Sequence, residues 1–309
     1  MAKHLFLRVA LLVVPLTLTA APVGAQIVES VGSRALGMGG AFVAVASDSS
    51  ATWWNPAGLA AGPFLDLAIG KADDASWFAL ATPPFGLSYY RLQITDVQAF
   101  NATTGQVAAN REDRGAGVPV RSLSVNQLGV TVLRTLIPGV HAGTTLKYLR
   151  GAIDDGDAEN TFDLDAGVLA VAGSFRFGGV VRNLRDPEFG GEGPAEGIRL
   201  QRQVRIGAAF NPEDATGVPL TVAIDADVRS YAASSGDRRV VALGAEHWVA
   251  SKRVGIRAGG RFNTVGARER SATAGVSVSP RPGLFVEGHV VGGGSADDEG
   301  WSVAARVSF

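Results

Sequence analysis

Few stretches of this chain carry residue types in an arrangement that could do chemistry. The glycine-rich run at residues 37–42 (GMGGAF) partly matches a dinucleotide-binding loop. That fingerprint needs a preceding strand, glycine or alanine at the position of Phe42, and an acidic residue about twenty positions further on. None of these conditions is met, so the sequence does not predict a nucleotide site.

The acidic and histidine residues give no stronger site. The loop at residues 154–159 (DDGDAE) could chelate a hard cation, but it lacks EF-hand spacing and is better interpreted as a solvated outside loop. The three histidines His141, His247 and His289 fall in different predicted strands, and the chain has no cysteine. Glu287 and His289 share one strand face, which alternation produces by chance, and no Gly-x-Ser-x-Gly is present. The sequence predicts no enzyme, no cofactor and no metal site.

The elements that carry these residues are strands. From about residue 64 onward, apolar and polar residues alternate, which gives each strand one apolar and one polar face. Most segments have 9 to 13 residues. This is close to the about 9–11 residues of a tilted strand crossing a bilayer, and longer than the about 5–6 residues usual in soluble sheets. The predicted strands are 64–70, 76–82, 85–95, 121–135, 139–151, 160–172, 174–183, 198–210, 219–230, 239–249, 252–262, 271–279, 283–292 and 300–309.

The connections between these strands sort by length, with short links alternating with longer polar ones. The short links are 83–84, 137–138, 173, 250–251 and 279–282. The link at 211–218 is the one long connection on the short side. Outer-membrane barrels have tight periplasmic turns and longer outside loops, whereas a β-sandwich has no reason to sort its loops in this way.

Charged side chains occupy the strand face opposite the apolar stripe. They are Arg176, Arg182, Arg205, Asp225, Asp227, Arg253, Arg257, Arg261 and Arg306. In a soluble β-sandwich they would form the solvated outer face. In a closed barrel they would line the lumen while the apolar stripe faces lipid, and closure pairs every backbone group, as hydrocarbon requires. Strand length and loop asymmetry favour an all-β fold, a closed antiparallel transmembrane β-barrel of about 14 strands.

The N-terminus predicts export. Lys3 and Arg8 accompany an apolar run at residues 5–18, and small residues precede Ala25, the pattern of a secretory signal peptide cut after Ala25. The mature chain would have 309 − 25 = 284 residues, with 26 basic and 29 acidic residues and a net charge of −3. That balance gives no electrostatic case for nucleic acid. No later apolar run reaches the about 18 residues of a transmembrane helix.

The C-terminus predicts the partners. The alternating series that ends at Phe309 resembles the signal read by the outer-membrane barrel assembly machinery. That machinery and outer-membrane lipid are therefore expected partners, and the expected location is the outer membrane of a Gram-negative-type bacterium. Trp77, Trp248 and Trp301 fall near predicted strand ends, where an interfacial aromatic girdle is expected.

The stretch at residues 33–59 closely resembles the N-terminal signature of the PorV/PorQ-like branch of the FadL-type outer-membrane proteins. In that family an A-x-A-x-D element and then NPAG lead into the first strand. The first element is residues 44–48 (AVASD), which ends at Asp48. The second is Asn55, Pro56, Ala57 and Gly58. The segments GVVRNL at 179–184 and LGAEHWV at 243–249 also resemble strand motifs of the family.

This resemblance implies a fourteen-stranded barrel whose N-terminal segment folds inward as a hatch or plug. The expected division is a signal peptide at 1–25, a hatch at 26–62 and the barrel at 63–309. The small residues of the hatch would let its backbone pack closely inside a crowded lumen. Pro56 would bias Asn55 away from the helical region and stiffen the chain where it meets the wall.

The resemblance leaves two functions open. FadL-type members take up long-chain fatty acids or other hydrophobic compounds by a lateral route, so the first hypothesis is a channel for small hydrophobic or amphipathic molecules. PorV-like members serve type IX secretion, so the alternative is a non-transporting surface protein that binds secreted protein cargo. The chain is short for the fatty-acid transporters, and its outside loops are expected to offer little apolar surface. Both features argue against high-affinity capture of fatty acids.

Overall fold

The computed structural model describes most of the chain beyond the predicted signal peptide. The described residues are 23–25, 31–98, 120–154, 156–190, 198–233, 236–266, 268–293 and 299–309. Nearly all of the predicted signal peptide therefore lies outside the described residues, as do Asp155 of the acidic loop and residues 26–30 of the predicted hatch.

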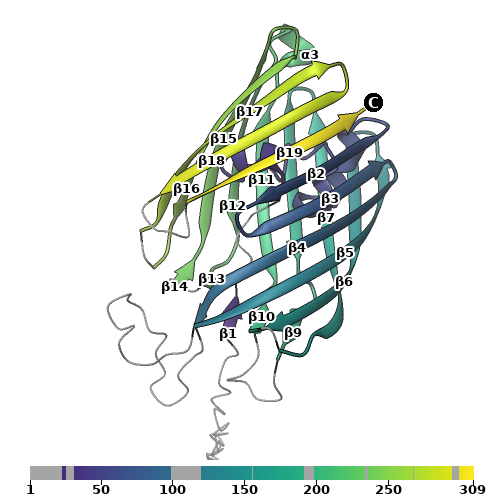
Figure 1. The fold of residues 1–309 in the computed structure, drawn as a ribbon. Coiled ribbons are helices and arrows are strands. Elements are labelled where there is room, and N and C mark those ends of the chain that lie inside the picture. Colours follow the sequence, from purple (N-terminus) through teal and green to yellow (C-terminus); the bar gives the residue numbers. More distant parts are fainter. Residues whose placement is uncertain are drawn as a thin grey trace, which may run out of the picture.

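Fourteen antiparallel strands close into a barrel, as the sequence predicts (Figure 1). Each strand pairs with its neighbours in sequence, and β19 closes the ring by pairing with β2. The strands are β2 (Asp66–Ala72), β3 (Ala75–Thr82), β4 (Phe85–Gln98), β5 (Val120–Ile137), β6 (Val140–Ile153), β7 (Glu159–Ala172), β8 (Phe175–Arg182), β11 (Gln203–Phe210), β12 (Leu220–Asp227), β15 (Val240–Val249), β16 (Val254–Asn263), β17 (Arg270–Arg281), β18 (Leu284–Gly293) and β19 (Gly300–Ser308).

The alternation in the sequence gives the barrel wall an outer face and an inner face of different composition. Large apolar side chains such as Ile69, Ile224 and Val303 are exposed all around the outside, while the residues between them point inward. An apolar outer belt of this kind suits contact with hydrocarbon rather than water. No helix in the described part of the chain is both long enough and apolar enough to cross a bilayer.

Two details of the wall differ from the predicted strands. The predicted strand at 198–210 is divided into β10 (Ile198–Leu200), which pairs with β9 and β1, and β11; between them Arg202 binds the Leu184 carbonyl and Asp186. Among the connections, β2 and β3 are joined by only two residues, although their link lies at the end of the barrel that carries the longer loops. We call that end the loop end and the opposite one the turn end.

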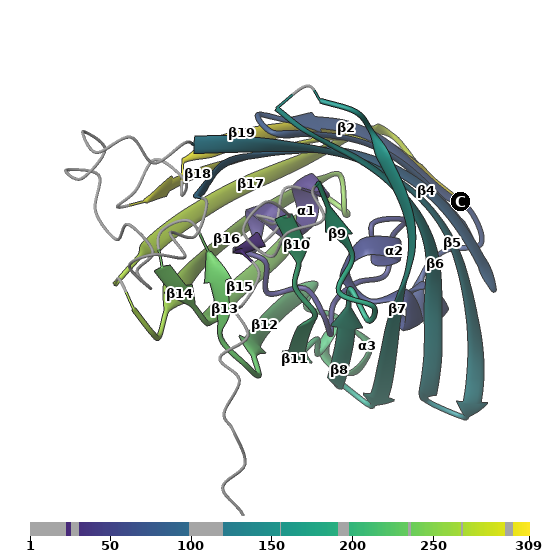
Figure 2. The ribbon, with the colours of Figure 1, turned by 90° about the horizontal axis from the view of Figure 1, so that it is seen from below.

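Several short elements lie inside the ring or at its ends (Figure 2). The interior holds α1 (Ser33–Gly37), α2 (Ala51–Trp54) and the 3-10 helix η1 (Pro56–Ala61). At the loop end, β9 (Glu188–Phe189) and β10 form a small sheet with β1 (Val23–Ala25), and β13 (Tyr231–Ala233) pairs with β14 (Gly236–Arg238). The helix α3 (Glu213–Thr216) forms part of the long link at the turn end. Since β1 belongs to the predicted signal peptide, a chain cut after Ala25 would lack it.

Candidate functional site: the barrel lumen and its plug

Residues 31–62, which we call the plug, fill the turn-end half of the lumen and are almost wholly buried. Their backbone lies on inward-facing glycines that pair across neighbouring strands. Three such pairs are Gly143–Gly167, Gly178–Gly207 and Gly244–Gly259. A Cβ on Gly259 would lie 2.3 Å from the Met38 carbonyl carbon, and one on Gly178 would lie 2.5 Å from the Val43 oxygen. These glycines let the plug backbone touch the wall, which a larger side chain would prevent.

Side chains of the wall also satisfy the backbone of the plug. The amides of Phe42 and Val43 both donate to the Asp225 carboxylate at 2.8 Å. Asn55 donates from its side-chain amide to the carbonyls of Val43 and Val168, and accepts from the amide of Ala57. The Asn-Pro-Ala-Gly motif therefore ties the plug to itself and to β7, while Pro56 takes the first position of η1, where no amide hydrogen is needed.

A buried ion network joins α1 to the wall. Arg34 binds Glu246 of β15 with Nη2–Oε1 at 2.7 Å, and Arg257 of β16 binds the same carboxylate with Nε–Oε2 at 2.6 Å. Arg34 also lies 3.2 Å from Asp48 within the plug. Burial opposes ionisation of Asp48, but the charges of Arg34 and Arg306 outweigh it and hold the pKa of this carboxyl below its ordinary 3.8.

The network continues around the barrel to its closing strand pair. Arg306 of β19 lies 3.1 Å both from Glu287 of β18 and from Asp66 of β2. Asp66 in turn accepts a hydrogen bond from the backbone amide of Ser49 in the plug. Arg257 and Arg306, which alternation assigned to the lumen, therefore belong to the network that holds the plug in place.

The remaining predicted lumen residues fall into four groups. Arg205 and Asp227 form a buried pair at 2.8 Å, and Arg261 is buried as well. Arg182 stacks over the rings of Trp53 and Trp54 in the plug, at 5.4 and 5.3 Å from the ring centroids. The prediction for Arg253 was wrong: β16 begins at Val254, two residues after the predicted start at 252, so Arg253 is exposed in the turn. Arg176 lies at the turn end and is discussed below.

The residues weighed for catalysis have structural contacts. His289 Nδ1 lies 2.6 Å from the Ser302 hydroxyl, which donates to Ser33 of α1, so this pair anchors the plug. Glu287 is held by arginine. In the described part of the chain, no group of three or more acidic or histidine residues is placed to hold a metal. The sequence analysis missed Lys147, which lies 2.7 and 2.6 Å from Asp163 and Asp165 inside the barrel.

Two of the three tryptophans assigned to the girdle point inward instead. Trp77 is buried and its ring packs on Gly70 of the neighbouring strand, while Trp248 lines an interior cavity. Only Trp301 of the three is exposed on the outer face. Position near a strand end therefore did not decide which face carried the ring. The alternation along β3 decides the face, because it places Trp77 on the inward side together with Ala75 and Ala79.

Toward the loop end, one side of the lumen wall becomes apolar. On β4, β5 and β6, six inward residues of the loop-end half whose side chains the structure describes are apolar and buried: Leu92, Ile94, Leu123, Val125, Leu149 and Ile153. We call this surface the apolar chamber. Strands that line a water-filled pore carry polar residues inside, so this surface does not suit an aqueous channel. Sequence analysis expected the lumen to be lined by charges and missed it.

Three apolar side chains from the β8–β11 connection cover the chamber: Phe189 on β9, and Ile198 and Leu200 on β10. A Cβ on Gly151 of β6 would lie 2.8 Å from Cγ of Phe189, so the ring packs directly on that glycine. The expectation that the outside loops offer little apolar surface was therefore wrong for this connection. Figure 2 shows β9 and β10 within the ring of strands.

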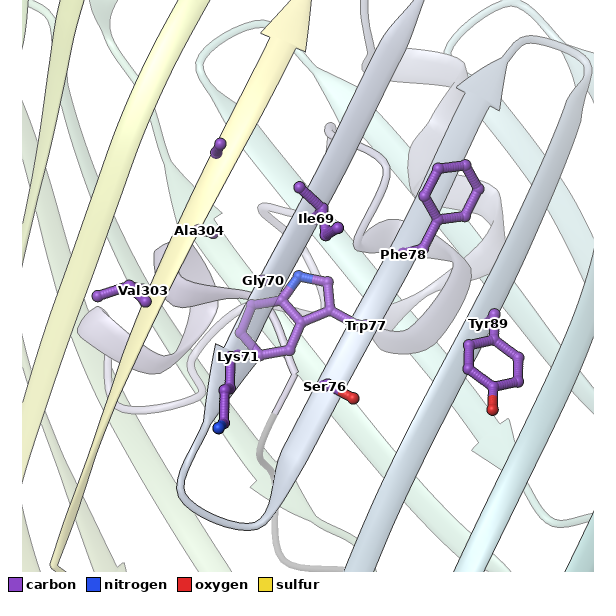
Figure 3. A pocket seen from close by; sticks show the side chains of 10 residues that line it. Ile69, Gly70, Lys71, Ser76, Trp77, Phe78, Tyr89, Val303 and Ala304 are labelled. Atoms are coloured by element: carbon purple, nitrogen blue, oxygen red, sulfur yellow. The ribbon is translucent and has the colours of Figure 1, made fainter.

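A shallow groove of about 600 Å³ lies on the outer face of the wall at β19, β2, β3 and β4. Its exposed lining includes Ile69, Phe78 and Val303. Figure 3 shows the Trp77 indole beside Gly70 at this place. Gly70 adds no side chain to the wall, so backbone and the indole separate the groove from the lumen here. The ladder of β2 and β3 is nevertheless paired without interruption from Asp66 to Lys71.

Comparison with known proteins shows the fold to be that of FadL-type channels. A FadL homologue from Pseudomonas aeruginosa aligns with a TM-score of 0.64 at 10% identity, over 92% of this chain and 99% of that one. The CymD monoaromatic hydrocarbon channel gives 0.62 at 13% identity, over 91% and 98%. The toluene transporter TodX from Pseudomonas putida gives 0.56 at 10% identity, over 93% and 99%.

Sequence comparison adds less. The family described as "F plasmid transfer operon, TraF, protein" matches residues 89–227, which is less than half of the chain. No curated protein matches the sequence.

Proposed function

We propose that this protein is an outer-membrane channel of FadL type that carries small hydrophobic or amphipathic molecules through the apolar chamber. The chamber is the observation that carries the proposal. The fold supports it, since the similar structures named above include hydrocarbon channels. The apolar outer belt supports a location in the outer membrane.

The cover over the chamber is held weakly enough to be displaced. The strands β9 and β10 have only two and three residues, and the ion pair between Glu188 and Arg199 that joins them is more than a third exposed. Exposed ion pairs contribute about 0–1 kcal/mol. Elements with few hydrogen bonds and short ladders open locally at low free-energy cost. A hydrophobic molecule that replaces Phe189 exchanges one apolar contact for another, so the chamber remains dry.

The plug remains seated in this account. Its backbone is satisfied by Asp225 and Asn55, and its charges are paired with the wall. A molecule that enters from the loop end therefore reaches the chamber before it reaches the plug. From there the lateral route would lead past Trp77 to the groove on the outer face, where Ile69 and Phe78 offer an apolar landing surface.

The test is uptake of a radiolabelled monoaromatic hydrocarbon by cells that lack their own hydrophobic-compound channels. Val125→Asn replaces two methyl groups with an amide in the chamber, where an unpaired polar group costs about 1–3 kcal/mol. We expect it to raise the half-saturation concentration by about tenfold, since 1.4 kcal/mol corresponds to that factor. The matched control is Gln127→Asn, on the same face of β5 but outside the chamber, which should behave as wild type.

Wild-type uptake no faster than in cells without the protein would refute the channel. Copurification of secreted proteins would then favour the cargo-binding alternative.

A further inference from the structure

The long link at the turn end builds a small polar cavity that the proposed transport function does not use. The cavity has a volume of about 130 Å³ and lies between the plug, α3 and the ends of β8, β12 and β15. Its charged lining residues are Arg34, Arg176, Glu213, Glu246 and Lys252. Asn211 and Thr221 add neutral polar groups.

The charges around the cavity leave one cation over. Glu246 is neutralised by Arg34 and Arg257, and Glu213 by Lys252 with Nζ–Oε1 at 2.5 Å. Arg176 is half-buried and makes no ion pair or hydrogen bond with any residue that the structure describes. The other carboxylate near it, Asp214 on α3, is exposed and does not line the cavity.

We propose that this cavity binds a small oxyanion, a carboxylate or a phosphate, with Arg176 as its main ligand. A guanidinium presents two parallel N–H groups that match the oxygens of either anion. The Asn211 amide donates one N–H to the Thr221 hydroxyl oxygen at 3.2 Å, so its second N–H and the Thr221 O–H can complete the donor set. The volume accommodates a phosphate-sized group but no large ligand, and the position at the turn end makes the site independent of the apolar chamber at the loop end.

The test is calorimetric titration of the purified, detergent-solubilised full chain with inorganic phosphate and, separately, with acetate, at ionic strength held constant with chloride. We expect at least one of the two anions to bind, and the two arms distinguish phosphate from carboxylate. Arg176→Gln should weaken that binding at least tenfold, while Arg253→Gln, an exposed arginine of a nearby turn, should leave it unchanged.

A conservative variant protects the test against misfolding. Arg176→Lys keeps the charge but loses the planar fork, and should bind at least threefold more weakly than wild type. The proposal is overturned if neither anion binds above chloride, or if Arg176→Gln binds as tightly as wild type. Equal losses in Arg176→Gln and Arg253→Gln would also overturn it, because they would indicate a general effect of charge.

Discussion

Replacing Glu246 with glutamine should loosen the plug without disturbing the barrel. The Glu246 carboxylate accepts hydrogen bonds from both Arg34 and Arg257 and is 2% exposed. Removing one partner of a buried pair costs about 3–5 kcal/mol, because the remaining charge is left uncompensated. Asp48 still pairs with Arg34, and Glu287 lies 3.9 Å from Arg257, so the lower end of that range applies. We therefore expect the free energy that holds the plug in the lumen to fall by about 3 kcal/mol.

The assay uses the absence of cysteine from the chain. Ser49 is fully buried in the plug, and Ser49→Cys is nearly isosteric, so its rate of maleimide labelling reports transient opening of the plug. A loss of about 3 kcal/mol predicts labelling about 100-fold faster in Glu246→Gln, since 1.4 kcal/mol is tenfold.

The control for this assay is Lys252→Gln. It breaks an ion pair in which the lysine is 62% exposed, and it should change labelling by less than about fivefold. Labelling of Glu246→Gln at the rate of the parent would refute the idea that this network holds the plug.

Three further outcomes follow from the lumen geometry. Gly259→Ala should misplace the plug and speed labelling of Ser49→Cys, because its Cβ would meet the Met38 carbonyl at 2.3 Å. The control Gly260→Ala should not change labelling, because its Cβ meets nothing closer than 3.4 Å. Asp48 has a pKa below its ordinary value, so its contribution to plug retention is fully present above about pH 4 and is lost as the pH falls through the folded-state value. Amide protection of the plug, corrected for intrinsic exchange, should therefore stay level from neutral pH to about pH 5 and fall below about pH 4. That fall should be smaller in Asp48→Asn, and an equal fall in both proteins would exclude Asp48 as its source. Disulfide formation in Ser33→Cys/Ser302→Cys, whose hydroxyls lie 2.8 Å apart, should leave hydrocarbon uptake unchanged, and a loss on oxidation would mean that the plug must move.

Sequence reasoning predicted the wall well because alternation is a local property. All fourteen predicted strands overlap a strand of the barrel, and Asp225, Arg257 and Arg261 are on the inward face. It failed at Arg253 because a shift of two residues at the start of β16 moves this side chain from the lumen into a turn. The polar character expected of every inward face was the larger error.

The two interior features that matter most needed the fold. Gly244 and Gly259 seat the plug only because β15 and β16 place them opposite each other, although glycine at an inward position is a signal the sequence does carry. The apolar chamber arises where three neighbouring strands place Ile94, Leu123 and Ile153 opposite one another. Its cover comes from a connection more than thirty residues further along the chain, which periodicity cannot place.

The central claim is that hydrophobic molecules pass through the apolar chamber after its cover moves. The most direct measurement is hydrocarbon uptake by Gly151→Cys/Phe189→Cys, in which a disulfide would fasten β9 to β6. A Cβ at position 151 would lie 2.8 Å from the Phe189 Cγ, so the two Cβ atoms are at most about 4.3 Å apart, below the upper limit of about 4.5 Å for a disulfide. We predict that oxidation stops uptake and that reduction restores it. Equal uptake by the oxidised and reduced forms would contradict the account.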